Sequence, residues 1–512
     1  MTIRWLGRHR FWVASAMLVA LMAIGSSRGY WHEDFWEHAA AVRELATQPL
    51  RPHHPLFQLD STPHVYFTPY HHVVAVLARV LSLAAEDALA VFGVLNLLLW
   101  LAGLRRFIGA FFGSDHDRIS FYALLLILLL SPAAVVWNWS GFFHFGVLGG
   151  AMPYPATFAT GATFLLLSLL PTWLVGGGRA RLLRLALLAG LAAVILLAHP
   201  PTAGFAFAGI VAVSWSAGAS RGRRVLAGAT LVAGGIGLAL LWPQFSILEM
   251  ARVANPGFQG INSVLYRRLL RACYPVLIAL PMVLVAFHAR RAEHRSAPLL
   301  IMIAIMAAAY AAGYLAGQHM LGRLLSPLSM IVQIGVAMIA AEWEERVRRG
   351  ARRWLLPLCG LGLALAALNR PNVAVLRRII VEHPSTYADF LFLRRWTGQY
   401  DVVLSDLKTS WLIPAFGGKI VASYHPMHFV ADYDDRRADL ERFLREGTST
   451  AERWSILRRY RVDYLALHKG KEADRQRFEP FGPVTYQNAT LELREVAWER
   501  AGEGDVPSGA RR

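Results

Sequence analysis

The chain has 512 residues, of which 55% are hydrophobic and 17% are charged, and its formal net charge is +18. A soluble domain has about a quarter of its residues charged, so this composition argues against a soluble enzyme and excludes disordered, collagen-like and disulfide-scaffold proteins. The apolar residues are gathered in blocks of about 16–22, the length with which a helix crosses about 30 Å of hydrocarbon. We therefore expect a polytopic α-helical membrane protein.

The positive charge is concentrated in the apolar part of the chain. Residues 1–370 contain 30 Lys and Arg against 14 Asp and Glu, a balance of +16, whereas residues 371–512 contain 22 against 20, a balance of +2. Basic residues in short loops between apolar blocks orient the spans with those loops in the cytoplasm. Nucleic acid is not an expected partner, because no soluble basic face carries the charge. Cys273 and Cys359 lie in apolar blocks without metal-type spacing, so we interpret them as small buried hydrophobic residues.

The apolar blocks predict about eleven to thirteen membrane spans. The first, residues 11–26, follows three arginines and has no small-residue cleavage site before Arg28, which favours an uncleaved span with a cytoplasmic N-terminus over a secretory signal. Residues 70–85 are apolar but contain His71, His72 and Arg79, and fit a further span, an interfacial helix or a broken helix. The other blocks lie near residues 86–104, 119–138, 150–171, 183–198, 201–217, 225–241, 272–288, 298–317, 323–341 and 354–369.

This arrangement predicts three domains or segments. Residues 1–370 form the transmembrane domain, with a large first external loop at residues 28–70. Residues 371–499 form a small α/β domain on the outer face, and residues 500–512 form a disordered tail. Within the α/β domain we expect a partly parallel sheet, because strand-like runs alternate with helical spacing. The strand-like runs are residues 400–405, 419–423, 462–467 and 490–496, and the helical stretches are 436–445 and 451–460.

The first external loop is the most promising place for chemistry. Seven of the eighteen histidines fall in residues 32–72, in and just after this loop, and the loop contains five acidic residues of the transmembrane part. Residues 34–46 have helical spacing that places Asp34 and His38 on one face at i, i+4, where they could form an acid/base pair. The alternative is a surface helix lying on the bilayer with acidic residues near its N-terminus. His and carboxylate ligands would suit Zn or Mn, but no metal-ligand spacing is present, so we expect no cofactor.

A second candidate lies at the outer end of a predicted span, at residues 318–323. It contains His319 and Arg323, and an ionisable residue at the edge of a span is costly, which favours a functional role. An arginine there could bind a lipid phosphate bidentately. The alternative is an arginine that only extends to the interface.

Several short motifs together resemble the GT-C superfamily of polytopic membrane glycosyltransferases, including its ArnT-like, PMT-like and mannosyltransferase-like bacterial members. The acidic pair Glu33-Asp34 opens the first external loop on an amphipathic helix, and a Pro-Tyr entry at residues 68–70 leads into the next apolar segment. The HPPTAGF turn at 199–205 and GRLLSP at 322–327 are also similar to elements of bacterial members, and residues 405–423 and 456–467 resemble their outer domain.

The resemblance implies an inverting glycosyl transfer on the outer face of a bacterial inner membrane. The donor would be a polyprenyl-phosphate sugar and the acceptor a glycan, lipid or protein. The family's catalytic carboxylate falls on Asp34, with Glu33 as second choice and His38 as an orienting or acceptor-binding group. Arg323 would stabilise the charge on the leaving phosphate, and the further substrate or lipid-phosphate contacts would come from His319, Tyr70, His71 and His72.

Two other functions remain open from the sequence. A transporter or flippase of lipid-linked glycans would place polar residues in the middle of its spans, whereas here they gather at the outer ends. A non-catalytic scaffold for envelope assembly would use the C-terminal domain to bind partners.

Overall fold

The computed structural model describes most of the chain. The described residues are 2–31, 34–59, 63–130, 141–174, 179–216, 221–252, 256–289, 296–349, 370–381, 387–427, 429–469 and 476–501. Glu33, Cys359, the predicted span at 354–369 and residues 502–512 of the predicted tail lie outside them.

The predicted fold class is confirmed: the chain is a polytopic α-helical membrane protein with a small C-terminal α/β domain. Among the described residues, seven helices are long and apolar enough to cross a membrane. They are α1 (Thr2–Ser27), α4 (Ala85–Phe112), α7 (Pro155–Trp173), α8 (Arg179–Ala198), α10 (Arg221–Leu240), α15 (Ala297–Leu315) and α16 (Leu325–Arg349), the last preceded by the 3-10 turn η3 (His319–Leu324). Three other helices occupy the remaining predicted spans that are described, namely α5 (His116–Leu130), α9 (Pro200–Trp215) and α14 (Leu269–Ala289). The apolar part of α14 is the shorter stretch Cys273–Ala289.

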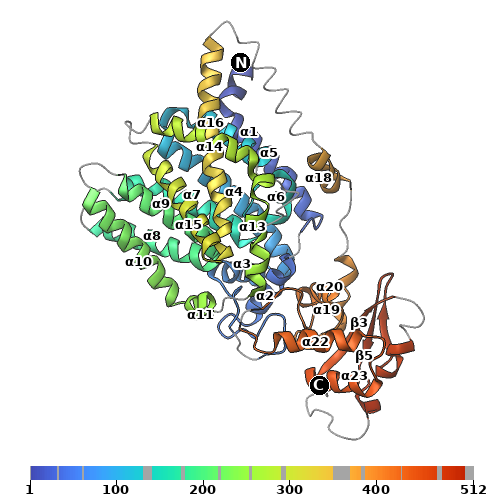
Figure 1. Ribbon diagram of the computed structural model, residues 1–512. Coiled ribbons are helices and arrows are strands. Elements are labelled where there is room, and N and C mark those ends of the chain that lie inside the picture. The colour runs from blue at the N-terminus through green and yellow to red at the C-terminus, as the bar shows by residue number, and fades with distance from the viewer. Residues whose placement is uncertain are drawn as a thin grey trace. The chain divides into compact units, whose positions relative to one another are not determined.

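The described residues form two compact units. The first comprises residues up to 32, residues 68–70 and residues 90–383, and it contains the long apolar helices (Figure 1). The second comprises residues 33–67, 71–89 and 384 onward. Residues 33–67 of the first external loop therefore belong to the same unit as the C-terminal sheet. The domain limits expected from the sequence, with a boundary at residue 370, stay a prediction.

Small residues let the helices of the first unit approach closely. A Cβ on Gly103 of α4 would lie 2.5 Å from the carbonyl oxygen of Gly161 on α7, and a Cβ on Gly161 would lie 2.7 Å from the backbone nitrogen of Trp100. Such close backbone contact is typical of helices that pack in membranes, where van der Waals packing replaces the hydrophobic effect. Elsewhere in this unit α8 packs on α10, and α5 packs on α16.

Buried charges in the first unit are paired across helices. Arg10 of α1 donates through Nη1 and Nη2 to the two carboxylate oxygens of Glu344 on α16, at 3.1 and 2.9 Å. The hydroxyl of Tyr122 on α5 donates to the same carboxylate at 3.0 Å. Arg118 and Glu345, which are partly exposed, form a further ion pair between α5 and α16. The bidentate geometry of the Arg10–Glu344 pair compensates for the desolvation of its two charges.

The ambiguous segment at residues 70–85 forms a short helix, α3 (Pro69–Val80). Twelve residues extend about 18 Å, which is well below the thickness of the hydrocarbon core. The chain then turns at Ser82, whose φ of +52° is left-handed, and α4 begins at Ala85. Of the three interpretations, the full additional span is therefore wrong.

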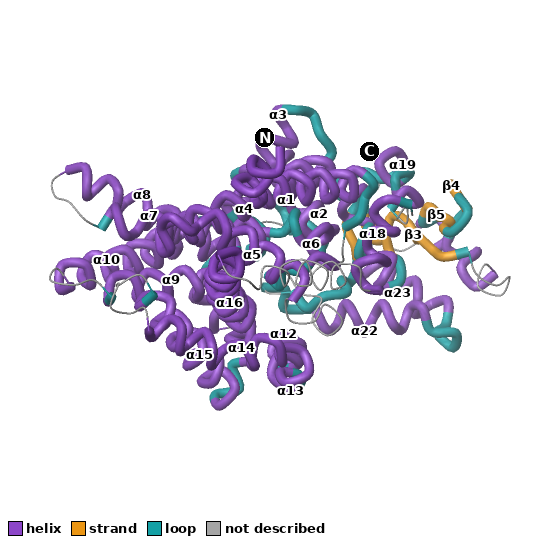
Figure 2. Tube along the Cα trace, turned by 90° about the horizontal axis from the view of Figure 1, so that it is seen from above, coloured by secondary structure: helices purple, strands orange, loops and turns teal. Residues whose placement is uncertain are grey.

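The sheet of the second unit has five strands in the order β2-β1-β3-β5-β4. β1 (Val402–Leu404) pairs in parallel with both β2 (Lys419–Ile420) and β3 (Val462–His468), whereas β5 (Leu491–Glu495) is antiparallel to β3 and to β4 (Val484–Gln487). The strands are drawn in orange in Figure 2. The helices α22 (Tyr433–Leu444) and α23 (Thr450–Tyr460) belong to the same unit. The partly parallel sheet is confirmed, and β4 is a strand that the sequence analysis missed.

The first external loop is built into this unit by backbone and helix contacts. The helix α2 (Phe35–Thr47) packs on α21 (Ile413–Phe416). The backbone nitrogen of Ile420 in β2 donates to the carbonyl oxygen of Leu56 at 2.7 Å. Ten of the thirteen residues of α2 are buried, so the alternative of a helix lying on the bilayer surface is wrong.

Candidate active site

The N-terminus of α2 places two carboxylates beside one histidine. Asp34 immediately precedes the helix, and its side chain is 40% exposed, whereas Glu37 in the first turn is 1% exposed. Nδ1 of His425 lies 2.9 Å from Oε1 of Glu37 and 3.6 Å from Oδ1 of Asp34. A carboxylate can only accept, so Nδ1 of His425 carries the proton and donates to Glu37. The exposed carboxylate is the one that a substrate can reach.

The groups around Glu37 hold it in place. The hydroxyl of Tyr66 donates to Oε2 of Glu37 at 3.3 Å. His425 follows β2 by five residues, and its ring packs edge-on against Trp411 with the centroids 4.7 Å apart. Glu37 and Asp34 therefore face the same ring nitrogen of His425, and a fixed imidazole of this kind can position a neighbouring carboxylate.

The predicted residues His38 and His71 form a buried pair. Nδ1 of His38 lies 2.8 Å from Nε2 of His71, and the ring of Tyr66 packs on His38 at 4.3 Å. Burial lowers the pKa of His38 to about 3 and holds the pKa of His71 well below its ordinary value. Both rings are therefore neutral near pH 7, where one donates to the other. His72 donates from Nε2 to the carbonyl oxygen of Pro49 at 3.2 Å.

Tyr70 belongs to the first unit rather than to this cluster. Its hydroxyl donates to the carbonyl oxygen of Pro153 at 2.8 Å and accepts from Nδ2 of Asn96 at 2.9 Å. Asn96 also donates to the carbonyl oxygen of Met152 at 3.0 Å. These hydrogen bonds connect the start of α3 to α4 and to the turn before α7. We therefore interpret Tyr70 as a structural residue.

Arg323 and His319 lie on η3 in the first unit. Nε of Arg323 donates to Oδ1 of Asn262 at 3.1 Å, and Nδ1 of His319 donates to the carbonyl oxygen of Gln259 at 3.2 Å. Arg323 also lines a hollow of about 10 Å³ together with His199, Thr202 and other residues of α9 and α16. That volume is about the size of one water molecule. The structure thus brings together the two short motifs at residues 199–205 and 322–327 that the sequence analysis singled out.

The sequence did not single out four polar residues of the second unit that lie in or near this site, namely Glu37, His425, Glu44 and Lys419. Glu37 is one turn beyond Asp34 and would have been found by helical spacing, but His425 is 388 positions away from Glu37 along the chain. The other two, Glu44 of α2 and Lys419 of β2, form a buried ion pair at 2.9 Å that supports the helix carrying Glu37. Among the described residues, no group of three His, Cys, Asp or Glu side chains is placed to hold a metal ion.

Comparison with known proteins shows a likeness to solved structures. No family model and no curated protein matches the chain. Among solved structures, the crystal structure of the Archaeoglobus fulgidus oligosaccharyltransferase, tethered with an acceptor peptide containing the NVT sequon, is similar with a TM-score of 0.52. The sequence identity is 10%, and the alignment covers 97% of this chain and 75% of the other. At this identity the likeness is one of fold, and it supports the GT-C-like architecture expected from the sequence.

Proposed function

We propose that this protein is an integral membrane glycosyltransferase that moves a sugar from a polyprenyl-phosphate donor to a glycan, lipid or protein acceptor. The observation that carries the proposal is the exposed carboxylate of Asp34 beside the His425–Glu37 pair, because a transferase needs a base at a surface that its acceptor can reach. The similar fold of an oligosaccharyltransferase, whose crystal structure holds a tethered acceptor peptide, supports the same class of reaction.

The proposed reaction is a single inverting displacement. The acceptor hydroxyl oxygen attacks C1 of the sugar and forms the new glycosidic bond, while the bond between C1 and the phosphate oxygen breaks. The electron pair of that bond stays on the lipid phosphate, and the hydroxyl proton passes to Asp34. His425, oriented by Glu37, positions the Asp34 carboxylate, and we assign to Arg323 the stabilisation of the charge on the leaving phosphate.

The remaining predicted groups have supporting tasks in this proposal. His38, His71 and His72 hold the helix and loop that present Asp34, and His319 holds η3 beside Arg323. We further propose that the protein resides in the inner membrane of a bacterium, with its N-terminus in the cytoplasm and the C-terminal domain on the outer face. The excess of arginines in alternate loops supports this orientation.

A donor screen tests the proposal. Membranes carrying the wild-type chain and the Asp34→Asn variant are supplied with radiolabelled polyprenyl-phosphate sugars, and transfer to endogenous acceptors is measured. We expect Asp34→Asn to lower transfer by about 10²–10⁴-fold while the protein still folds and inserts. The matched control is Asp87→Asn, which removes an exposed carboxylate of the same unit and should leave transfer unchanged. Full activity of Asp34→Asn would overturn the assignment of the base, and absence of transfer from every donor by the wild type would overturn the function.

A further inference from the structure

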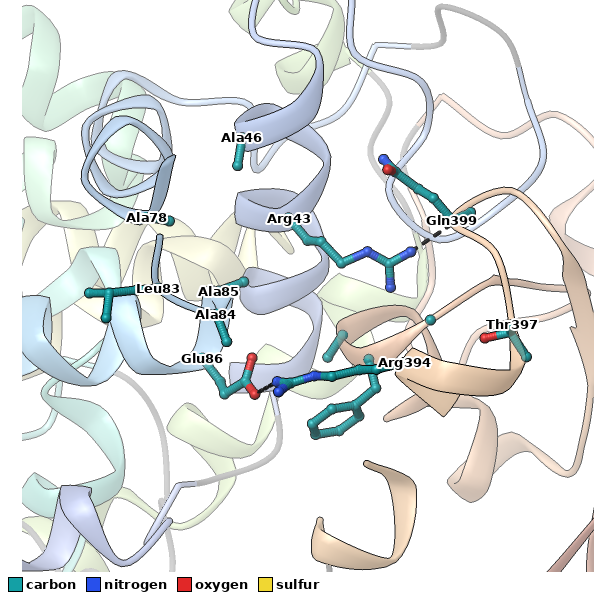
Figure 3. A pocket seen from close by; sticks show the side chains of 13 residues that line it. Arg43, Ala46, Ala78, Leu83, Ala84, Ala85, Glu86, Arg394, Thr397 and Gln399 are labelled. Carbon is teal, nitrogen blue, oxygen red and sulfur yellow. Dashed lines mark hydrogen bonds and ion pairs between the residues drawn. The ribbon is translucent and has the colours of Figure 1, made fainter. Parts of the chain in front are cut away.

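The second unit contains a cavity of about 430 Å³ that none of the proposed catalytic groups lines. Its walls come from α2, from the turn between α3 and α4, from α19 (Leu393–Trp396) and the residues after it, and from α21 (Figure 3). Cavities of about 300–1,000 Å³ are the size that holds small molecules. Arg43 is nine residues beyond Asp34, so the cavity is displaced by about 13 Å along α2 from the candidate active site.

One wall presents the guanidinium of Arg43, whose hydrogen bonds are to neutral groups. Nη1 donates to the carbonyl oxygen of Pro414 at 2.9 Å, and Nη2 donates to that of Gln399 at 3.4 Å. Burial lowers the pKa of Arg43 to about 10, and the arginine nevertheless stays charged near pH 7. A guanidinium has five N–H donors, so these two bonds leave donors for an anion in the cavity.

The cavity is also lined by an ion pair in which one carboxylate oxygen has no partner. Arg394 pairs with Oε1 of Glu86, and its guanidinium lies 5.5 Å from the ring centroid of Phe416 (Figure 3). The other oxygen of Glu86, Oε2, is buried and has no hydrogen-bond partner among the described residues. A buried acceptor without a partner costs free energy, which a hydroxyl or ammonium donor from a bound molecule would recover.

These groups define the chemistry of the ligand. Two arginines and one glutamate give the charged lining a balance of +1, which matches a ligand with one negative charge. Oε2 of Glu86 requires a donor on the same molecule. The small side chains of Ala46 and Ala78 line the same cavity and leave room there for the body of a ligand.

We propose that this cavity binds a sugar that carries a carboxylate, with the carboxylate on Arg43 and Arg394 and a hydroxyl donating to Oε2 of Glu86. This inference rests on the proposed function in one respect, namely that the hydroxylated anion is identified as a sugar. It implies that the second unit recognises an acidic sugar residue. It requires no transfer chemistry, so binding is measured without any donor, and its failure is distinguishable from failure of the glycosyltransferase assignment.

The test is a calorimetric titration of the purified full chain in lipid nanodiscs. D-glucuronate, D-glucose and glucose 6-phosphate are titrated separately, and their dissociation constants are compared. We expect D-glucuronate to bind at least about tenfold more tightly than D-glucose, because a charge-assisted bond is lost with the neutral sugar. Equal binding of the two, or tighter binding of glucose 6-phosphate, would overturn the proposed ligand class.

Variants locate the binding to the cavity. Arg43→Gln should weaken D-glucuronate about tenfold or more, whereas Arg51→Gln, which removes an exposed arginine of the same unit, should not change it. Since Arg43 also holds backbone carbonyls, Ala46→Leu provides a second variant that fills the cavity and leaves every charge in place. Unchanged binding in Ala46→Leu and Arg43→Gln would overturn the proposed location.

Discussion

Nζ of Lys419 lies 2.9 Å from Oε2 of Glu44, and both side chains are almost completely buried although they are 375 positions apart. The same ammonium donates to the carbonyl oxygens of His54 and Pro55, at 2.8 and 3.3 Å. The carboxylate of Glu44 also accepts from Nε2 of Gln399 at 3.0 Å and from the backbone nitrogen of His53 at 3.0 Å. This pair fastens the first external loop and α2, which carries the candidate base, to strand β2.

Breaking this pair should destabilise the second unit strongly. We expect Lys419→Met to lower the free energy of unfolding by about 3–5 kcal/mol, because the Glu44 carboxylate is then buried without its cation. Urea unfolding of the full chain in detergent, followed by tryptophan fluorescence, measures the change. The exposed Lys408→Met is the control, and the double variant with Glu44→Gln should recover part of the loss. Equal stability of Lys419→Met and Lys408→Met would contradict the importance of the pair.

The buried histidines should make the second unit sensitive to acid. In the unfolded chain an imidazole takes up a proton near pH 6.5, whereas burial lowers the pKa of His38 to about 3 and that of His71 well below its ordinary value. Between about pH 3 and pH 6.5 the unfolded state therefore binds more protons than the folded state. The contribution of these neutral imidazoles to the free energy of unfolding is fully present above about pH 6.5. It is lost as the pH falls toward 3, by at most about 1.4 kcal/mol per pH unit for each imidazole.

Unfolding measurements at several pH values test this dependence. His38→Asn keeps a polar group near His71 but removes one titrating ring, so stability should fall less steeply with decreasing pH. His468→Asn removes a histidine whose side chain is 62% exposed and should leave the slope as in the wild type. A slope that is the same in all three proteins would argue against the role of the buried pair.

Glu37 should act on the reaction through His425. We expect Glu37→Gln to lower kcat about 10–100-fold with little change in the KM for the acceptor, because the amide no longer holds the imidazole with a charge-assisted bond. The pH dependence of kcat should shift as well, since the charge nearest to His425 is removed. Steady-state transfer assays across pH measure both effects. Glu446→Gln, an exposed carboxylate of the same unit, serves as control, and a change in KM alone would assign Glu37 to acceptor binding instead.

Arg323 should affect the donor rather than the acceptor. Arg323→Gln removes the cation that we assign to the lipid phosphate, so we expect transfer to fall about 10²–10³-fold, and Arg323→Lys should restore only part of it because an ammonium lacks the bidentate fork. The readout is kcat and the KM for the polyprenyl-phosphate sugar. Arg252→Gln replaces an exposed arginine of the same unit and should behave as the wild type. Wild-type kinetics in Arg323→Gln would remove this residue from the site.

The sequence alone predicted the features that depend on local patterns. Apolar blocks of sufficient length marked the helices of the first unit, and alternating runs marked β1, β2, β3 and β5. The i, i+4 spacing suggested an acid/base pair of Asp34 and His38, whereas in the structure Asp34 precedes α2 and lies near His425, and His38 contacts His71. The strand β4, at Val484–Gln487, was missed because its residues are exposed or half-buried and do not alternate.

Only the tertiary structure decided which of these residues act together. His425 reaches Glu37 and Asp34 because β2 and the first external loop belong to one unit, and no period or spacing in the chain encodes a contact between residues 388 positions apart. The sequence likewise gives no sign that Arg43, Glu86 and Arg394 line one cavity. Hydrophobic length determines that a segment becomes a helix, but long-range packing and charge pairing determine which polar side chains meet.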